Sequence, residues 1–164
     1  MDTMDLTVAI DPGSGGHDDL IMTIPLLGLE ICADTYYFAI ALEDAGSEFD
    51  QSDVKKGVAS LLRRWSEASK ACICGETVHL PFDFSDKHVG CIQLIRRDSV
   101  FFISYGYCDL PGYSVNPLKL GSFCREVSDF KMTTKTAIDV PCQSFLLAMD
   151  FAIASIEQEF ATKH

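Results

Sequence analysis

The chain has 164 residues, of which 48% are hydrophobic and 23% are charged, and its formal net charge is −11. This length and composition suit one globular domain with a core. The longest early apolar segment, residues 20–31, contains Pro25 and Gly28 and is too short to span a bilayer. We therefore expect a single domain over residues 1–164, without a signal peptide and in the cytoplasm.

The first third of the chain is predicted to be mainly extended. Residues 5–10 (DLTVAI) are predicted to form a short strand, and residues 20–31 an extended segment in which Pro25 marks an edge or a bend. Residues 35–43 (TYYFAIALE) are rich in aromatic and β-branched residues, which favours a strand. Residues 44–51 are expected to form a loop.

Residues 52–70 have the spacing of an amphipathic helix, with Ser52 as the expected N-cap and Asp53 in the first turn. Its apolar face consists of Val54, Val58, Leu61, Leu62, Trp65 and Ala68. Its basic residues, expected mainly on the other side, are Lys55, Lys56, Arg63, Arg64 and Lys70. An amphipathic helix requires charge on its outer side, so this pattern favours a solvated face over a nucleic-acid site.

The central part of the chain predicts an antiparallel hairpin. Residues 77–84 are expected to be an edge strand because they contain Pro81. In residues 88–107, two apolar runs flank a short polar stretch, which is the strongest hairpin signal in the chain. Residues 108–129 contain two prolines and two glycines and are expected to form a long ordered loop, followed by a short strand near residues 135–138.

The last predicted element is a helix over residues 141–161, in which Pro141 suits the first position. Its apolar stripe consists of Phe145, Met149, Ala152, Ile153, Ile156 and Phe160. The elements together predict an α+β fold, with a mainly antiparallel β-sheet and two amphipathic helices packed on it.

The acidic residues are concentrated in the first third of the chain. Residues 1–54 contain twelve acidic residues and no lysine or arginine, whereas the remaining residues contain all 13 basic residues and the other twelve acids. An acidic field on one side of a protein repels nucleic acid and anionic membranes and attracts a basic partner. An acidic surface also serves solubility by itself, and this interpretation stays open.

No motif in the chain specifies a reaction. The segment IDPGSGGHDD, residues 10–19, is rich in glycine but lacks the lysine of a phosphate loop and the spacing of a calcium loop. The seven cysteines are scattered and are expected to be reduced, and the pair Cys72 and Cys74 lacks a second pair of zinc ligands. We expect no catalytic residue, no metal and no cofactor.

Two function classes other than the binding of a basic partner stay open. One is a small enzyme that uses a cysteine or an aspartate cluster, with His79 or His88 as the base for Cys72, Cys91 or Cys108. A tightly bound metal or a perturbed thiol pKa would favour this class. The other is a structural or adaptor subunit, which a large exposed apolar patch and stable self-association would favour.

The profile of the whole chain resembles that of bacterial immunity proteins of polymorphic toxin systems, including those of contact-dependent growth inhibition. The resemblance is carried by small size, acidity, the lack of catalytic motifs, the predicted hairpin, the loop SYGYCDLPGYSVNPL and the closing helix. It implies a cytoplasmic protein that binds a cognate basic toxin domain, often a nuclease, and blocks its active site or substrate surface. We expect neither nucleic acid nor a membrane as a partner.

Carboxylates on a rigid scaffold can occupy the positions that a nuclease provides for phosphates. The residues expected to supply them are Asp11, Asp18, Asp19, Glu43, Asp44, Glu48, Asp50 and Asp53. Tyr105, Tyr107 and Tyr113 suit a binding surface or a packed loop.

Overall fold

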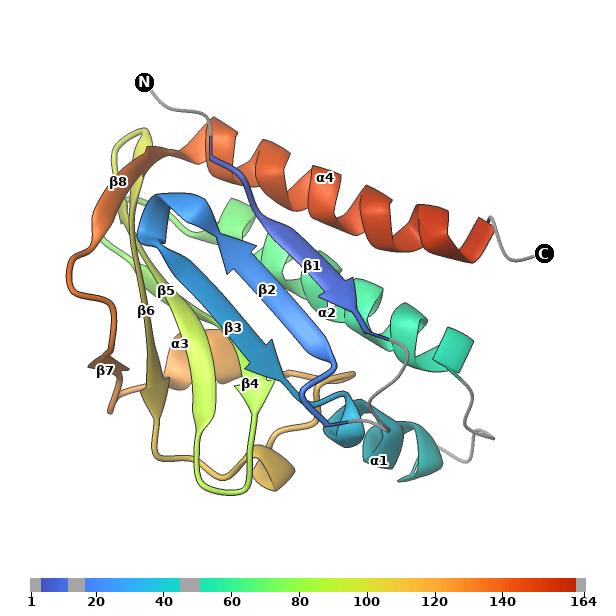
Figure 1. Cartoon of the computed structure of the whole chain (residues 1–164). Coiled ribbons are helices and arrows are strands. Elements are labelled where there is room, and N and C mark those ends of the chain that lie inside the picture. Colours follow the sequence, from blue (N-terminus) through green and yellow to red (C-terminus); the bar gives the residue numbers. More distant parts are fainter. Residues whose placement is uncertain (1–3, 12–16, 45–50, 162–164) are drawn as a thin grey trace.

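The computed structural model describes residues 4–11, 17–44 and 51–161, apart from the side chains at positions 44, 51, 52 and 159–161. Two antiparallel sheets, of three and five strands, are covered by two long helices, α2 (Gln51–Ala71) and α4 (Cys142–Ala161). The helices pack together and against strands, as Figure 1 shows. The predicted α+β class is therefore confirmed, with the strands divided between two sheets.

The three-stranded sheet consists of β1 (Thr7–Ile10), β2 (Leu20–Ile24) and β3 (Leu29–Ala33), in that order. Alternate residues of β2 are buried, as expected for a strand that packs one face on a core. Between β2 and β3 the chain turns through a 3₁₀ helix, η1 (Pro25–Leu27). Gly28 has a φ of +61° and donates its N–H to the carbonyl of Pro25, so the predicted bend at Pro25 is confirmed.

Residues 35–43 do not form the predicted strand, because Tyr36–Asp44 is a helix, α1. Tyr37, Phe38 and Ala41 are its buried residues, and their spacing fits one face of a helix. The Thr35 carbonyl accepts the N–H groups of Phe38 (3.0 Å) and Ala39 (3.2 Å), which starts the first turn. Aromatic and β-branched composition is a weak preference, and the packing of this segment overrides it.

The five-stranded sheet consists of β4 (Thr77–Phe84), β5 (Val89–Arg97), β6 (Val100–Cys108), β7 (Lys131–Met132) and β8 (Ile138–Pro141). The predicted hairpin is confirmed by the pairing of β5 with β6, and β4 is the expected edge strand. Both β7 and β8 pair with β6. The expected strand near residues 135–138 begins only at Ile138.

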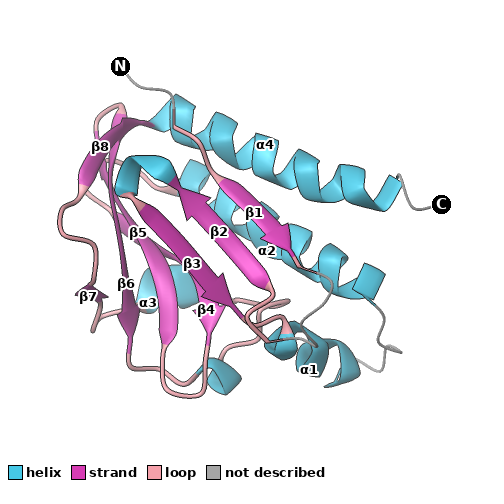
Figure 2. Ribbon diagram, in the orientation of Figure 1, coloured by secondary structure: helices cyan, strands magenta, loops and turns pink. Residues whose placement is uncertain are grey.

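The loop predicted at residues 108–129 contains two short helical segments, η2 (Gly112–Ser114) and α3 (Phe123–Glu126). Figure 2 shows α3 as a short helix beside the larger sheet. Its residues pack near β4, so the loop covers part of this sheet.

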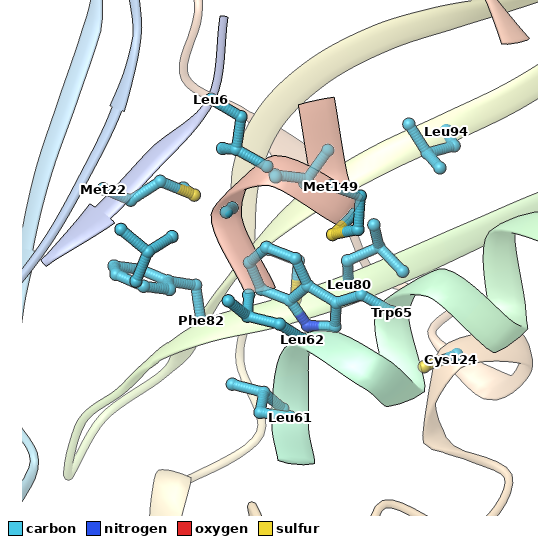
Figure 3. Packing of buried hydrophobic residues seen from close by; sticks show 14 of the residues in the cluster. Leu6, Met22, Leu61, Leu62, Trp65, Leu80, Phe82, Leu94, Cys124 and Met149 are labelled. Atoms are coloured by element: carbon cyan, nitrogen blue, oxygen red, sulfur yellow. The ribbon is translucent and has the colours of Figure 1, made fainter. Parts of the chain in front are cut away.

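The predicted apolar faces of both long helices are confirmed for the described side chains, which do not include that of Phe160. Figure 3 shows where they meet: Trp65 of α2 and Met149 of α4 lie among side chains of both sheets. The indole N–H of Trp65 donates to the carbonyl of Pro81 (2.9 Å), which the outer edge of β4 leaves available. The core is therefore formed jointly by both helices and both sheets.

Three details of the helix predictions are wrong. Helix α2 begins at Gln51, which puts Ser52 inside the first turn instead of at the N-cap. Lys55, expected on the solvated side, is only 7% exposed. Pro141 is the last residue of β8, and α4 begins directly after it. The two differences at the helix starts are shifts of one or two residues, which are normal where local pattern alone decides a boundary.

No helix in the described part of the chain combines the length and the apolar character needed to cross a membrane.

Candidate functional site

Asp19, one of the eight acidic residues predicted to face a partner, is buried. Its carboxylate accepts hydrogen bonds from the backbone N–H of Thr35 (2.9 Å) and from the Thr35 hydroxyl (2.6 Å). These bonds hold the residue from which α1 starts. Hydrogen bonds to a charged group contribute about 1.5–3 kcal/mol, so Asp19 stabilises the fold at this point.

Asp11 and Asp18 are both exposed at one end of the three-stranded sheet, on either side of the β1–β2 connection. The Asp11 N–H donates to the backbone carbonyl of Asp19 (2.7 Å). Asp18 has a φ of +50°, and its N–H donates to a carboxylate oxygen of Asp34 (2.7 Å). Both residues are therefore placed by backbone hydrogen bonds while their side chains face solvent.

The other predicted residues lie around the α1–α2 connection. Glu43 is exposed in the last turn of α1, and Asp53 is partly exposed in the first turn of α2, 3.9 Å from the Lys56 ammonium. Asp44 ends α1, but its side chain is outside the described atoms. Glu48 and Asp50 also lie outside the described residues.

Four aspartates gather where the two sheets approach α1, and we call this group the acidic end: Asp18, Asp34, Asp83 and Asp86. Asp34 follows β3, Asp83 lies in β4, and Asp86 lies in the β4–β5 turn, at the bottom of Figure 1. The charges of Asp34 and Asp18 both act on Asp83. The Tyr37 hydroxyl donates to Asp86, which ties α1 to the turn.

The basic side chains that contact the carboxylates of the acidic end in the described part of the chain are histidines, which carry a charge only when protonated. His17 Nδ1 lies 3.7 Å from a carboxylate oxygen of Asp34, and His88 Nε2 lies 3.7 Å from one of Asp83. Each imidazole also contacts a tyrosine ring: Tyr36 for His17 and Tyr107 for His88. Two of the four carboxylates therefore lie beside a histidine whose ring contacts a tyrosine.

Burial raises the pKa of the Asp83 carboxyl; His88 opposes this shift, and Asp34 and Asp18 reinforce it. Beside Asp83 lies the buried hydroxyl of Tyr105, which has no hydrogen-bond partner among the described residues. A Cβ on Gly90 would collide with this hydroxyl and lie 2.9 Å from the Cβ of Asp83, so glycine is needed there. The acidic end thus holds closely spaced carboxylates whose repulsion a bound cationic group would relieve.

Sequence reasoning predicted Asp18 and missed the other three aspartates of the acidic end. Asp83 and Asp86 belong to the part of the chain that is close to neutral overall. The prediction relied on the excess of acidic residues in residues 1–54, so it did not include them. Asp34 belongs to the acidic third but carries no motif. The available signal was the segment DFSD at residues 83–86, at the end of a predicted strand, but nothing local indicates which other strand ends lie beside it.

The seven cysteines are free, and Cys91 and Cys108 form a thiol pair between β5 and β6. The hydrogen bond with Cys91 lowers the pKa of Cys108 to about 6, against the effect of burial. However, Cys108 is only 1% exposed, and no hydrogen bond joins a histidine to a cysteine among the described residues. The pair therefore has neither the access nor the base that a catalytic thiol needs. No cluster of three or more metal-ligating side chains occurs in the described ranges.

His79 is buried in β4, where its ring contacts the Gln93 side chain (3.1 Å) and Phe130. Burial lowers the pKa of His79 to about 4, partly opposed by Asp129. In the unfolded chain a histidine has a pKa near 6.5. Between pH 6.5 and pH 4, His79 is therefore mostly protonated in the unfolded state and mostly neutral in the folded state. Protonation of His79 in the unfolded chain therefore lowers the free energy of unfolding as the pH falls from 6.5 towards 4, and it has no effect on that free energy above pH 6.5.

We expect the parent protein to lose about 2–3 kcal/mol more stability between pH 7 and pH 4.5 than the His79→Gln variant. Urea unfolding of both proteins at the two pH values measures this difference. Equal losses in the two proteins would contradict a neutral, buried His79.

Comparison with known proteins gives no match to a family model, to a curated protein or to a solved structure. The function is therefore argued from the residues and their geometry.

Proposed function

We propose that the protein is an immunity protein, which binds a basic toxin domain through the acidic end and neighbouring carboxylates. The observation that carries the proposal is the gathering of Asp18, Asp34, Asp83 and Asp86 from separate segments, in which His17 contacts Asp34 and His88 contacts Asp83. A nuclease concentrates lysine and arginine where it holds phosphates. The carboxylates of the acidic end would pair with these cations in place of the phosphates of the nucleic acid.

The surroundings of the carboxylates also support a protein partner. Tyr36 is 46% exposed beside His17, and it can pack against an arriving side chain without ordering a long flexible group. A guanidinium that enters between Asp34 and Asp83 can donate several hydrogen bonds in a plane, which favours arginine over lysine as the anchor. Glu43 and Asp11 would then form the solvated rim, where charge mainly accelerates association.

The test is to sequence the genes beside this chain's own and to co-express the chain with any basic toxin domain that they encode. We expect the chain to restore growth and to form a stoichiometric complex with that domain, because the acidic end covers the cations that hold the toxin's substrate. Growth assays and calorimetric titration of the purified proteins measure the two effects, with a toxin domain of another system as the control. Failure to bind the toxin, or equal binding of both toxins, would contradict the proposal.

A second candidate, an adaptor or structural subunit, is favoured by one feature of α4. Leu147 and Phe151 lie one turn apart and are 58% and 72% exposed. An apolar pair of this kind suits self-association, and a stable dimer in sedimentation experiments would favour this function. The pair is small, so the acidic end remains the better supported site.

A further inference from the structure

A cleft of about 450 Å³ lies between the last turns of α2 and the segment at residues 119–125, which includes α3. Arg64, Glu67, Ala68 and Ala71 line it from α2, and their spacing places them on one face of the helix. The volume is that of a site for a small molecule. None of the four aspartates of the acidic end lines the cleft.

The charge of this cleft is opposite to that of the protein as a whole. Arg64, Lys119 and Arg125 line it, with Glu67 as the acidic lining residue, although the chain carries a net charge of −11. The Lys119 side chain is exposed and makes no hydrogen bond or ion pair in the described part of the chain. The cleft therefore offers at least one uncompensated cation to a ligand.

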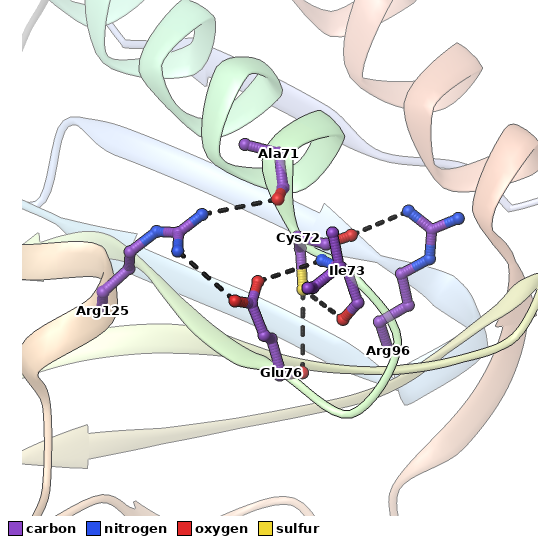
Figure 4. Close-up of polar contacts among 6 residues, drawn as sticks. All are labelled: Ala71, Cys72, Ile73, Glu76, Arg96 and Arg125. Carbon is purple, nitrogen blue, oxygen red and sulfur yellow. Dashed lines mark hydrogen bonds and ion pairs between the residues drawn. The ribbon is translucent and has the colours of Figure 1, made fainter.

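In the described part of the chain, the polar contacts of the two arginines are made with exposed or partly exposed groups. A guanidinium nitrogen of Arg125 lies 3.5 Å from Glu76, and another donates to the Ala71 carbonyl at 3.4 Å, as Figure 4 shows. Arg64 pairs with Glu67 at 3.2 Å, one turn along α2. Exposed ion pairs of this kind contribute little to stability, so both guanidinium groups can turn to a doubly charged oxyanion.

The inner wall of the cleft is apolar. Leu120 and Cys124 are each 8% exposed, and Ala68 lies opposite them on α2. Burial raises the pKa of the Cys124 thiol to about 11, so this wall is uncharged at neutral pH. The hydroxyl of Ser122 is another lining group, and it does not cap α3. A ligand can therefore place an anionic head among the cations and an apolar part against the wall.

We propose that this cleft binds a small phosphomonoester, with the phosphate among Lys119, Arg125 and Arg64 and the organic part against Leu120 and Ala68. A phosphomonoester fits better than a carboxylate because its two negative charges match several cations at once. The proposal is independent of toxin binding, since the cleft and the acidic end lie on different elements. It adds a ligand-binding site to the proposed immunity function.

The experiment uses the full chain labelled with ¹⁵N, titrated at constant ionic strength with phenyl phosphate, inorganic phosphate and phenol in turn. We expect saturable shifts of amide signals in residues 64–71 and 119–125 with phenyl phosphate, and weaker binding of the other two probes. Lys119→Ala should weaken phenyl phosphate binding at least tenfold, and Lys119→Arg should restore most of it. Because the Lys119 side chain is exposed and makes no hydrogen bond or ion pair in the described part of the chain, these variants are expected to fold.

The matched control is Lys87→Ala, which removes an exposed lysine from the β4–β5 turn, outside the cleft, and should leave binding unchanged. If Lys87→Ala weakened phenyl phosphate binding as much as Lys119→Ala, the effect would come from the lost positive charge alone and not from a contact in the cleft. This result would overturn the proposal. Absence of saturable shifts at millimolar phenyl phosphate would also overturn it. No toxin enters this experiment, so its outcome is separate from that of the immunity test.

Discussion

Replacement of Phe145 with alanine is expected to lower the free energy of unfolding by about 3–5 kcal/mol. Phe145 lies on the buried face of α4 and is fully buried, and its ring meets that of Phe101 edge to face, with centroids 5.5 Å apart. Truncation removes this contact and leaves a cavity where α4 packs on β6, which the surrounding side chains fill only in part. A domain of this size is stable by about 5–15 kcal/mol, so the loss is a large fraction of the total. Urea unfolding monitored by circular dichroism measures the change.

Phe151→Ala is the matched control, because it makes the same chemical change on the same helix. Phe151 is 72% exposed, so its removal should alter stability by no more than about 0.5 kcal/mol. Equal unfolding midpoints for the two variants would mean that the inner face of α4 is not part of the core.

The second large effect concerns the acidic end. The double variant Asp34→Asn, Asp86→Asn should raise the dissociation constant for the cognate toxin domain roughly a hundredfold at low salt. Close charge pairs across interfaces couple by about 1.5–7 kcal/mol, and 1.4 kcal/mol corresponds to a factor of ten. Asparagine keeps an oxygen that can accept the Asp18 N–H and the Tyr37 hydroxyl, so the fold is expected to persist. Asp19 is left out of the variant because it supports α1 through Thr35.

The control for this experiment is the double variant Asp139→Asn, Asp150→Asn, which removes the same total charge from exposed positions on β8 and α4. It should bind nearly as tightly as the parent protein. A rise in salt from 0.1 M to 1 M shortens the Debye length from ~10 Å to ~3 Å and should slow association for all three proteins. Equal affinities of the two double variants would mean that the acidic end is not the contact surface.

The elements that were predicted correctly are those whose pattern repeats within the element itself. Trp65 and Phe145 belong to apolar stripes at helical spacing, which indicate a helix whatever it packs against. The hairpin of β5 and β6 is likewise predicted by two apolar runs on either side of a polar turn. Helix α1 was missed because it is short and apolar on several sides, so its periodicity did not outweigh its strand-like composition.

The sequence by itself determined the α+β class, both long helices, the hairpin and the strongly acidic character of the first third, because each depends on composition or on a repeat of a few residues. Only the tertiary structure decided which carboxylates share a surface. Asp19 lies 16 residues from the Thr35 that it holds, and Asp83 lies 49 residues from Asp34. The pairing of β2 with β3 brings Asp19 to Thr35, and the packing of one sheet beside the other, at β3 and β4, brings Asp34 to Asp83. Local pattern carries no information about contacts of this length, so the acidic end and the cleft beside α2 can be identified only in the folded chain.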